Sequence, residues 1–258
     1  MVTRIHPDPA LPADLTAITS DAYRQVKVRL REVITRLGET GRLRLPSEAE
    51  LSAALGVSRA TLRSALQSLQ KEGRIRRLHG HGTFINRHAL GLGANLAEAG
   101  AFMDLLAKAG HEASVSTAGR RVVALEADVA VSLEIPAGEQ ALRIERVFAA
   151  SGEPAVHSVD HFPVRLLGED PPALEPAQST FEFVELHLGP PVCYSVAEVR
   201  PVLPPPDVAA ALNVPATQPL LRLRHTHIRA DEQPVAVTVA HVNDEYLRFS
   251  VIRTYLDE

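Results

Sequence analysis

The feature that most constrains the fold is a pair of short helices separated by only three residues. Residues 47–55 read SEAELSAAL and residues 59–73 read RATLRSALQSLQKEG, both with apolar residues at helical spacing. The intervening Gly56 can end the first helix in a left-handed conformation, and Ser58 is a favoured N-cap for the second. Helices joined this tightly cannot lie antiparallel, so we expect them to cross steeply.

The flanking segments extend this pair into a larger motif. A helix is predicted from Asp21 to Leu37, and Ser47 with Glu50 three residues later predicts a capping box at the start of the first short helix. Residues 74–85, RIRRLHGHGTFI, place apolar pairs on either side of a turn with two glycines, which is typical of a β-hairpin. This order predicts a winged helix-turn-helix, whose second helix enters the major groove of DNA amino end first.

The predicted DNA-facing helix begins with hydrogen-bond donors. Ser58, Arg59, Thr61 and Arg63 lie on its first turns, where phosphates and base edges would accept their hydrogen bonds. An ordinary capped helix with solvated arginines is the alternative. The wider charge distribution favours DNA: residues 20–88 hold fourteen Lys and Arg against six Asp and Glu, a net charge of +8.

Composition divides the chain into two parts. At 258 residues we expect two domains, a module over residues 20–88 after a Pro-rich flexible arm at 1–19, and a larger domain over 89–258. The larger domain holds twelve Lys and Arg against twenty-three Asp and Glu, so only the basic module is expected to meet a polyanion. Chance clustering of charge on a solvated face is the alternative. The single Cys193 excludes a disulfide framework and, without a membrane-spanning apolar run, favours a reducing cytosol.

The acidic domain contains an internal repeat. Residues 128–162 align with residues 207–242, and each copy reads as a short helix, a proline turn and two β-rich stretches. We expect the two copies to pair into one antiparallel sheet with helices on one face, an α+β domain with a pocket where the halves meet. Between the copies, Ser179 and Glu182 predict a second capping box, whose helix start could hold an anion.

The basic module resembles the amino-terminal domain of the GntR family of bacterial transcription regulators, on the segment LPSEAELSAALGVSRATLRSALQSLQKEGRIRRLHGHGTF. The resemblance implies a DNA-binding surface with Ala49 and His81 at two positions where the family usually has a cation. Both changes remove positive charge at neutral pH. The predicted DNA-binding residues are Ser47, Ser58, Arg59, Thr61, Arg63, His79, Gly80 and His81.

The acidic domain looks like the effector-sensing UTRA domain of the HutC-type subgroup of that family, which has a chorismate-lyase-like fold. Family pockets often hold a phosphorylated sugar or a carboxylate, but Met103, Phe148, Ser158 and Thr238 replace polar or charged anchors, which leaves Arg146 as the anion partner. The resemblance therefore implies a small effector with one acidic group and an apolar body. The predicted effector-binding residues are Met103, Arg146, Phe148, Ser158, Ser179, Thr180, Thr238 and Tyr246.

Histidines offer one further possibility. His225 and His227 lie two residues apart on one predicted strand and could bind a metal with a third ligand, although hydrogen-bonded core or rim histidines are the interpretation we favour. We predict no cofactor and no catalytic motif, since the chain lacks a nucleophile elbow, a zinc-protease HExxH and a phosphate-binding loop.

Together these features predict a homodimeric, cytoplasmic repressor that binds operator DNA and is released by a small molecule. The alternatives are a regulator whose second domain only dimerises, and an enzyme of chorismate-lyase-like fold with a DNA-binding appendage.

Overall fold

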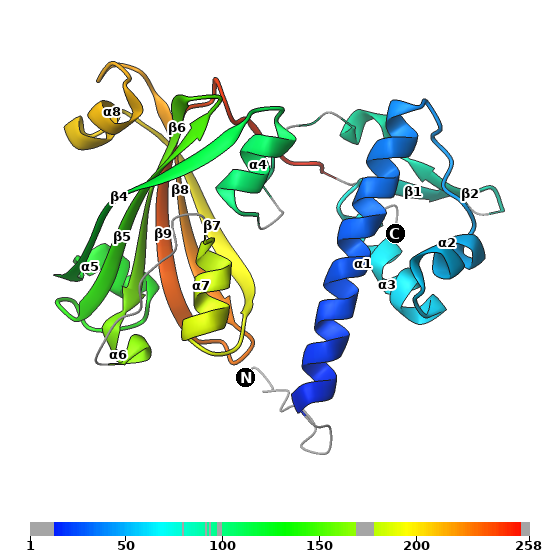
Figure 1. The fold of residues 1–258 in the computed structure, drawn as a ribbon, viewed down its shortest axis with the longest axis horizontal. Coiled ribbons are helices and arrows are strands. Elements are labelled where there is room, and N and C mark those ends of the chain that lie inside the picture. Colours follow the sequence, from blue (N-terminus) through cyan, green and yellow to red (C-terminus); the bar gives the residue numbers. More distant parts are fainter. Residues whose placement is uncertain are drawn as a thin grey trace. The chain divides into compact units, whose positions relative to one another are not determined.

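The structure, a computed structural model, describes residues 13–78, 80–90, 92, 94–96, 100–168 and 178–253, and of residues 13–22 and 24 only the backbone. The chain divides into two compact units (Figure 1). Unit 1 comprises residues 1–92 with 251–258, and unit 2 comprises residues 93–250. Among the described residues, no helix is both long enough and apolar enough to cross a bilayer.

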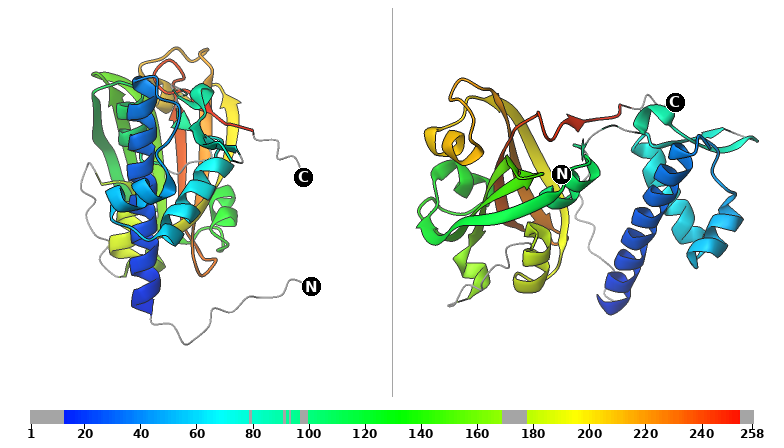
Figure 2. Two further views of the ribbon diagram at one scale, coloured as in Figure 1. Left: turned by 90° about the vertical axis from the view of Figure 1, so that its right-hand side faces the viewer. Right: turned by 45° about the horizontal axis from the view of Figure 1, so that its top comes forward.

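Unit 1 is a winged helix-turn-helix, as predicted. Its elements in chain order are α1 (Ala13–Glu39), α2 (Glu48–Leu55), α3 (Arg59–Lys71), β1 (Ile75–Leu78), β2 (Gly82–Ile85) and a 3-10 turn (Arg87–Ala89). The long α1, visible in both views of Figure 2, begins at Ala13. The expectation of a flexible arm through residue 19 is therefore wrong for residues 13–19, which extend the helix, and residues 1–12 lie outside the described part of the chain.

Local capping produces the tight pair of helices. The Glu50 amide donates to Ser47 Oγ over 3.3 Å and the Ser47 amide donates to Glu50 Oε2 over 2.8 Å, which confirms the capping box. Gly56 ends α2 with a φ of 66°, a conformation that costs glycine little. Ser58 then caps α3 by accepting from the Thr61 amide over 3.1 Å.

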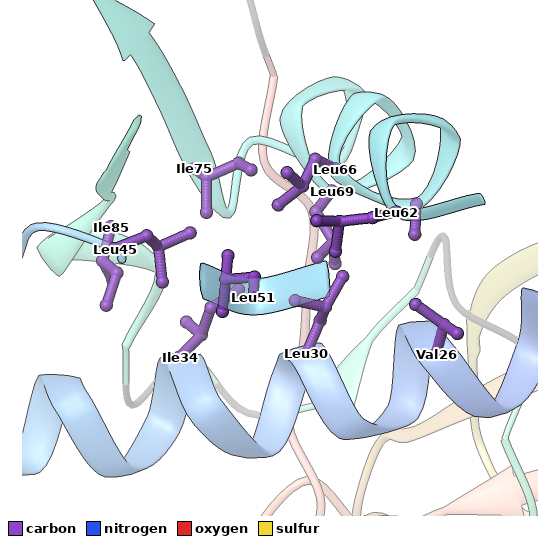
Figure 3. Close-up of a cluster of buried hydrophobic side chains, with 11 residues drawn as sticks. Val26, Leu30, Ile34, Leu45, Leu51, Leu62, Leu66, Leu69, Ile75 and Ile85 are labelled. Atoms are coloured by element: carbon purple, nitrogen blue, oxygen red, sulfur yellow. The ribbon is translucent and has the colours of Figure 1, made fainter. Parts of the chain in front are cut away.

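The core of unit 1 lies between α1, α3 and the wing (Figure 3). Leu30 of α1 and Leu62 and Leu69 of α3 are fully buried, and Ile75 and Ile85 anchor the hairpin to them. The buried side chains are Val26, Leu30, Ile34, Leu45, Leu51, Leu62, Ala65, Leu66, Leu69, Ile75 and Ile85. Burying each large side chain contributes about 1.5–3 kcal/mol, so this cluster fixes the orientation of α3 relative to the wing.

Unit 2 is built on one six-stranded antiparallel sheet with the order β4-β5-β6-β9-β8-β7. The strands are β4 (Ala113–Ala124), β5 (Gln140–Ala150), β6 (Glu153–Pro163), β7 (Val192–Val202), β8 (Leu220–Arg229) and β9 (Pro234–Val242). A short parallel pair, β3 (Ala94–Asn95) and β10 (Phe249–Ser250), lies outside this sheet. The antiparallel α+β class agrees with the prediction.

Helices cover both faces of the sheet, so the expectation of helices on one face is wrong. The helices of unit 2 are α4 (Phe102–Lys108), α5 (Ala127–Ser132), α6 (Val164–Leu167), α7 (Thr180–His187) and α8 (Pro206–Leu212). Apolar side chains of α7 pack with Leu142 and Ile144 of β5, whereas those of α5 pack with Ala141. Because successive residues of a strand point to opposite faces, α7 and α5 lie on opposite faces. We call the face of Leu142, Ile144, Arg146 and Phe148 face A, and the other face B.

The same order of elements occurs twice in unit 2. The first copy runs α4-β4-α5-β5-β6 and the second runs α7-β7-α8-β8-β9, with α6 as an addition between them. Strands β6 and β9 pair at the centre of the sheet, where His157 is opposite His241 and Val159 is opposite Val239. Each copy begins with a helix that packs on face A, α4 in the first copy and α7 in the second. The repeated order of elements is therefore longer than the two aligned sequence segments.

Candidate functional site

The first turn of α3 presents hydroxyls and one unpaired cation. Ser58 Oγ and Thr61 Oγ1 lie 2.8 Å apart, and both hydroxyls serve the cap of α3. Arg59 is exposed and makes no hydrogen bond or ion pair with any residue that the structure describes. Since this turn also contains no acidic residue, Arg59 is available to an anionic partner.

Arg63, by contrast, is held by a residue that the sequence analysis did not select. Glu48, at the start of α2, accepts from Arg63 Nη2 over 3.3 Å and from Arg77 Nη2 of the wing over 3.0 Å. The carboxylate thus links α2, α3 and β1. The only sequence signal for a role of Glu48 is its position directly after the Ser47 cap.

The wing turn contains the predicted glycines. Gly80 has a φ of 73° and Gly82 a φ of 106°, both in the region that favours glycine, and His81 lies exposed between them. The predicted contact His79 lies outside the described residues. A groove beside the wing is lined by Arg44, Ser47, Glu48, Arg77, Gly80 and Gly82. Of these, only Ser47 and Gly80 were among the predicted DNA-binding residues, and the two arginines were not.

In unit 2, a buried polar network lies on face A at the start of α7. Arg146 Nη2 donates to Asp160 Oδ2 over 2.6 Å, and the two side chains are 3% and 0% exposed. Asp160 also accepts from the hydroxyls of Thr180, over 2.9 Å, and Thr238, over 2.6 Å. Although burial favours the protonated acid, the Arg146 charge and these hydroxyls hold the pKa of Asp160 below its ordinary value, so the pair is ionised.

This network changes the role expected for Arg146. Its guanidinium was expected to be a partner for an acidic effector, but Asp160 already neutralises it, and Arg146 Nη1 donates to the Gln178 carbonyl over 2.5 Å. At the start of α7, Ser179 and Glu182 form the predicted capping box. Asp160 was missed because its role depends on a pairing with Thr238 across β6 and β9.

The remaining predicted effector residues gather on the same face. Ser158 is opposite Arg146 in the β5–β6 register, and its buried Oγ has no hydrogen-bond partner among the described residues. The Arg146 guanidinium lies 5.3 Å from the centre of the Phe148 ring. Met103 of α4 and Tyr246 pack against the apolar cluster that contains Phe148. All eight predicted residues thus lie on face A or on the segments that cover it.

His227 of β8 is hydrogen-bonded rather than free for a metal. His227 interacts with Thr238 Oγ1 over 2.9 Å and with Ser195 Oγ over 2.8 Å, so both ring nitrogens are engaged. Burial lowers the pKa of His227 to about 4, with a smaller contribution from His225, and therefore the ring is neutral at pH 7. Within the described residues, no group of three or more His, Cys, Asp or Glu side chains is arranged to hold a metal ion.

A second polar cluster lies on face B. His157 Nε2 contacts Glu145 Oε1 over 2.7 Å, and Glu145 also accepts from Arg143 over 2.5 Å. Burial lowers the pKa of both His161 and His241 to about 4, and nearby arginines add to the effect. This cluster contains an ion pair between Arg143 and Glu145 and a hydrogen bond between Glu145 and His157, and none of its residues was selected as an effector residue.

Comparison with known proteins identifies both units. Residues 19–85 match the family model "Bacterial regulatory proteins, gntR family", and residues 108–248 match the UTRA domain. The chain is 25% identical over 239 residues to the HTH-type transcriptional regulator GgaR of Escherichia coli K12, covering 93% of this chain and 92% of GgaR.

Two further comparisons agree. The HTH-type transcriptional repressor NagR of Bacillus subtilis is 25% identical over 207 residues, covering 79% of this chain and 83% of NagR. The crystal structure of the possible transcriptional regulator YydK from Bacillus subtilis superposes with a TM-score of 0.69 at 20% identity, covering 90% of this chain and 99% of YydK, and so shares its fold.

Proposed function

The chain belongs to the GntR family of bacterial regulatory proteins and carries a UTRA domain, and on this basis we propose that it acts as a dimeric repressor which a small molecule releases from its operator. It is a DNA-binding transcription regulator with an effector-binding domain. The DNA-binding surface is supported most directly by Arg59, which is exposed on the first turn of α3 and unpaired among the described residues. It lies near Arg63, which is joined to the wing through a shared carboxylate. We place the protein in the cytoplasm, where the bacterial chromosome lies.

A dimer is favoured because a single α3 can recognise only a short stretch of DNA. One recognition helix contacts only a few base pairs, and two copies related by a twofold axis read two half-sites. A relative of similar length is named as a repressor, which favours the same sign of regulation here. Sedimentation of the full-length chain tests the dimer, and a monomer bound to DNA with full specificity would contradict it.

We place the effector on face A, between α4 and α7. The predicted residues converge there, and Ser158 Oγ and Arg146 Nε are buried polar atoms without a partner among the described residues. An unpaired buried hydroxyl costs free energy that a ligand could recover. Because Arg146 is 3% and Ser158 1% exposed, an effector must displace part of α4 or the start of α7 to reach them.

Ser158→Ala tests this placement without breaking an interaction that the structure shows. The variant should keep the stability and DNA affinity of the parent, since the hydroxyl makes no hydrogen bond with the described residues. It should lose DNA release by whichever metabolite releases the parent in an anisotropy screen. Unchanged release would place the effector elsewhere, and a UTRA domain that only dimerises would give no release with any metabolite.

We also propose that the protein is not an enzyme. The relatives carry the names of transcriptional regulators, and the polar groups on face A form a closed ion-pair network rather than an acid and base separated by a substrate site. Turnover of a metabolite by the purified chain would contradict this.

A further inference from the structure

The groove beside the wing brings together two arginines from segments far apart in the sequence. Arg44 precedes the Leu-Pro-Ser-Glu segment, and Arg77 belongs to β1. Both line the groove with Ser47, Gly80 and Gly82. We propose that this groove holds a backbone phosphate of DNA, bound by Arg44 and Arg77, an inference that rests on DNA binding by unit 1.

Arg44 is positioned by the backbone of the wing. It forms an isolated antiparallel bridge with Phe84 of β2, so the segment before α2 runs beside the hairpin. A Cβ at Gly82 would lie 3.4 Å from Arg44 Nε, which shows that the Arg44 side chain lies against the wing at Gly82. Arg44 is exposed and makes no side-chain hydrogen bond or ion pair within the described residues, so its guanidinium has donors to offer a ligand.

Glu48 positions Arg77 and leaves part of its guanidinium unsatisfied. Arg77 Nη2 donates to Glu48 Oε1 over 3.0 Å, while the buried Arg77 Nε has no partner in the described part of the chain. Glu48 also contacts Arg63 of α3. The groove is therefore connected by one carboxylate to the helix that faces DNA, and a duplex that contacts α3 and the wing passes over it.

The donors of the groove favour an anion. Its lining holds two arginines, Arg44 and Arg77, and two carboxylates that are already engaged, Glu48 by Arg63 and Arg77 and Glu50 by Ser47. A guanidinium offers several N–H donors in a planar fork that matches phosphate oxygens. Such a contact carries no sequence information, so it must be detected with DNA of any sequence.

The test measures the salt dependence of non-specific binding by the full-length chain. A labelled random duplex of about 30 base pairs is titrated from about 50 to about 200 mM KCl, where each phosphate contact contributes about 0.9 to the slope of log affinity against log salt. Arg44→Ala and Arg77→Ala should each lower the slope by about 0.9 per bound subunit, so that the affinity of each variant falls about threefold less than that of the parent over this salt range.

Arg36→Ala is the matched control, because it removes an exposed arginine from α1 in the same unit. Its slope should equal that of the parent. If Arg44→Ala keeps the parent slope, or changes it no more than Arg36→Ala does, the groove does not bind phosphate, even where Arg59→Ala weakens binding. A parent chain that fails to bind the duplex at low salt would overturn the inference together with DNA binding itself.

Discussion

Replacing Asp160 by Asn should reveal how strongly unit 2 depends on its buried ion pair. Asp160 is completely buried and is the only acidic partner of Arg146 among the described residues. Removing one member of a buried pair leaves the other charge uncompensated, which typically costs about 3–5 kcal/mol. In a protein of this size, 1 kcal/mol shifts the melting temperature by about 2–4 °C, so Asp160→Asn should lower the unfolding temperature of unit 2 by roughly 10 °C.

Asp128→Asn provides the matched control. Asp128 also pairs with an arginine of unit 2, Arg224 over 2.9 Å, but its side chain is 56% exposed. Exposed pairs contribute about 0–1 kcal/mol, so this variant should melt within about 4 °C of the parent. Circular dichroism of the full-length variants at neutral pH makes the comparison. Equal shifts for the two variants, or a shift below about 2 °C for Asp160→Asn, would refute the reasoning that burial decides the energy of the pair.

Three further predictions follow from the described geometry. Arg59→Ala should weaken operator binding by about 1–3 kcal/mol if Arg59 contacts a base, and a gel-shift titration indistinguishable from the parent would remove it from the interface. His81→Arg should tighten DNA binding, because it places a permanent positive charge at the wing tip; affinity equal to that of the parent would show that the wing tip does not approach DNA. Unit 2 should lose stability as the pH falls from about 6.5 towards 4, because the pKa of His227 is lowered to about 4 in the folded state and the unfolded chain binds the proton first. For His227 alone the loss is roughly 2 kcal/mol at pH 5, and urea unfolding midpoints that do not change over this range would contradict it.

The sequence predicted unit 1 well because its signals are local. Ser47, Gly56 and Ser58 act through hydrogen bonds or backbone conformations within a few residues, and each lies where the capping rules place it. The flexible arm was predicted too long because its proline-rich composition conceals a helix that starts at Ala13. Glu48, Arg44 and Arg77 were missed because their contacts bridge residues that are 15 or more positions apart.

Unit 2 was harder to predict because its key contacts cross the sheet. The α+β class followed from the two similar segments, but the face that each helix covers depends on the register of β5, which composition does not reveal. Arg146 lies near Ser158, Thr180 and Thr238 as expected, yet its positive charge is compensated by Asp160, 14 residues away on the next strand. A polar residue on a predicted buried strand, such as Asp160, is the signal that should have drawn attention to this pair.

We propose that this chain recognises specific DNA through α3 and the wing. This proposal is tested by selection of sheared DNA from the protein's own genome with the purified chain, and with Arg59→Ala carried in parallel. We expect the parent to enrich a few fragments that share an inverted repeat, and Arg59→Ala not to enrich them. Enrichment without a common sequence, or an identical set of fragments with the variant, would contradict it.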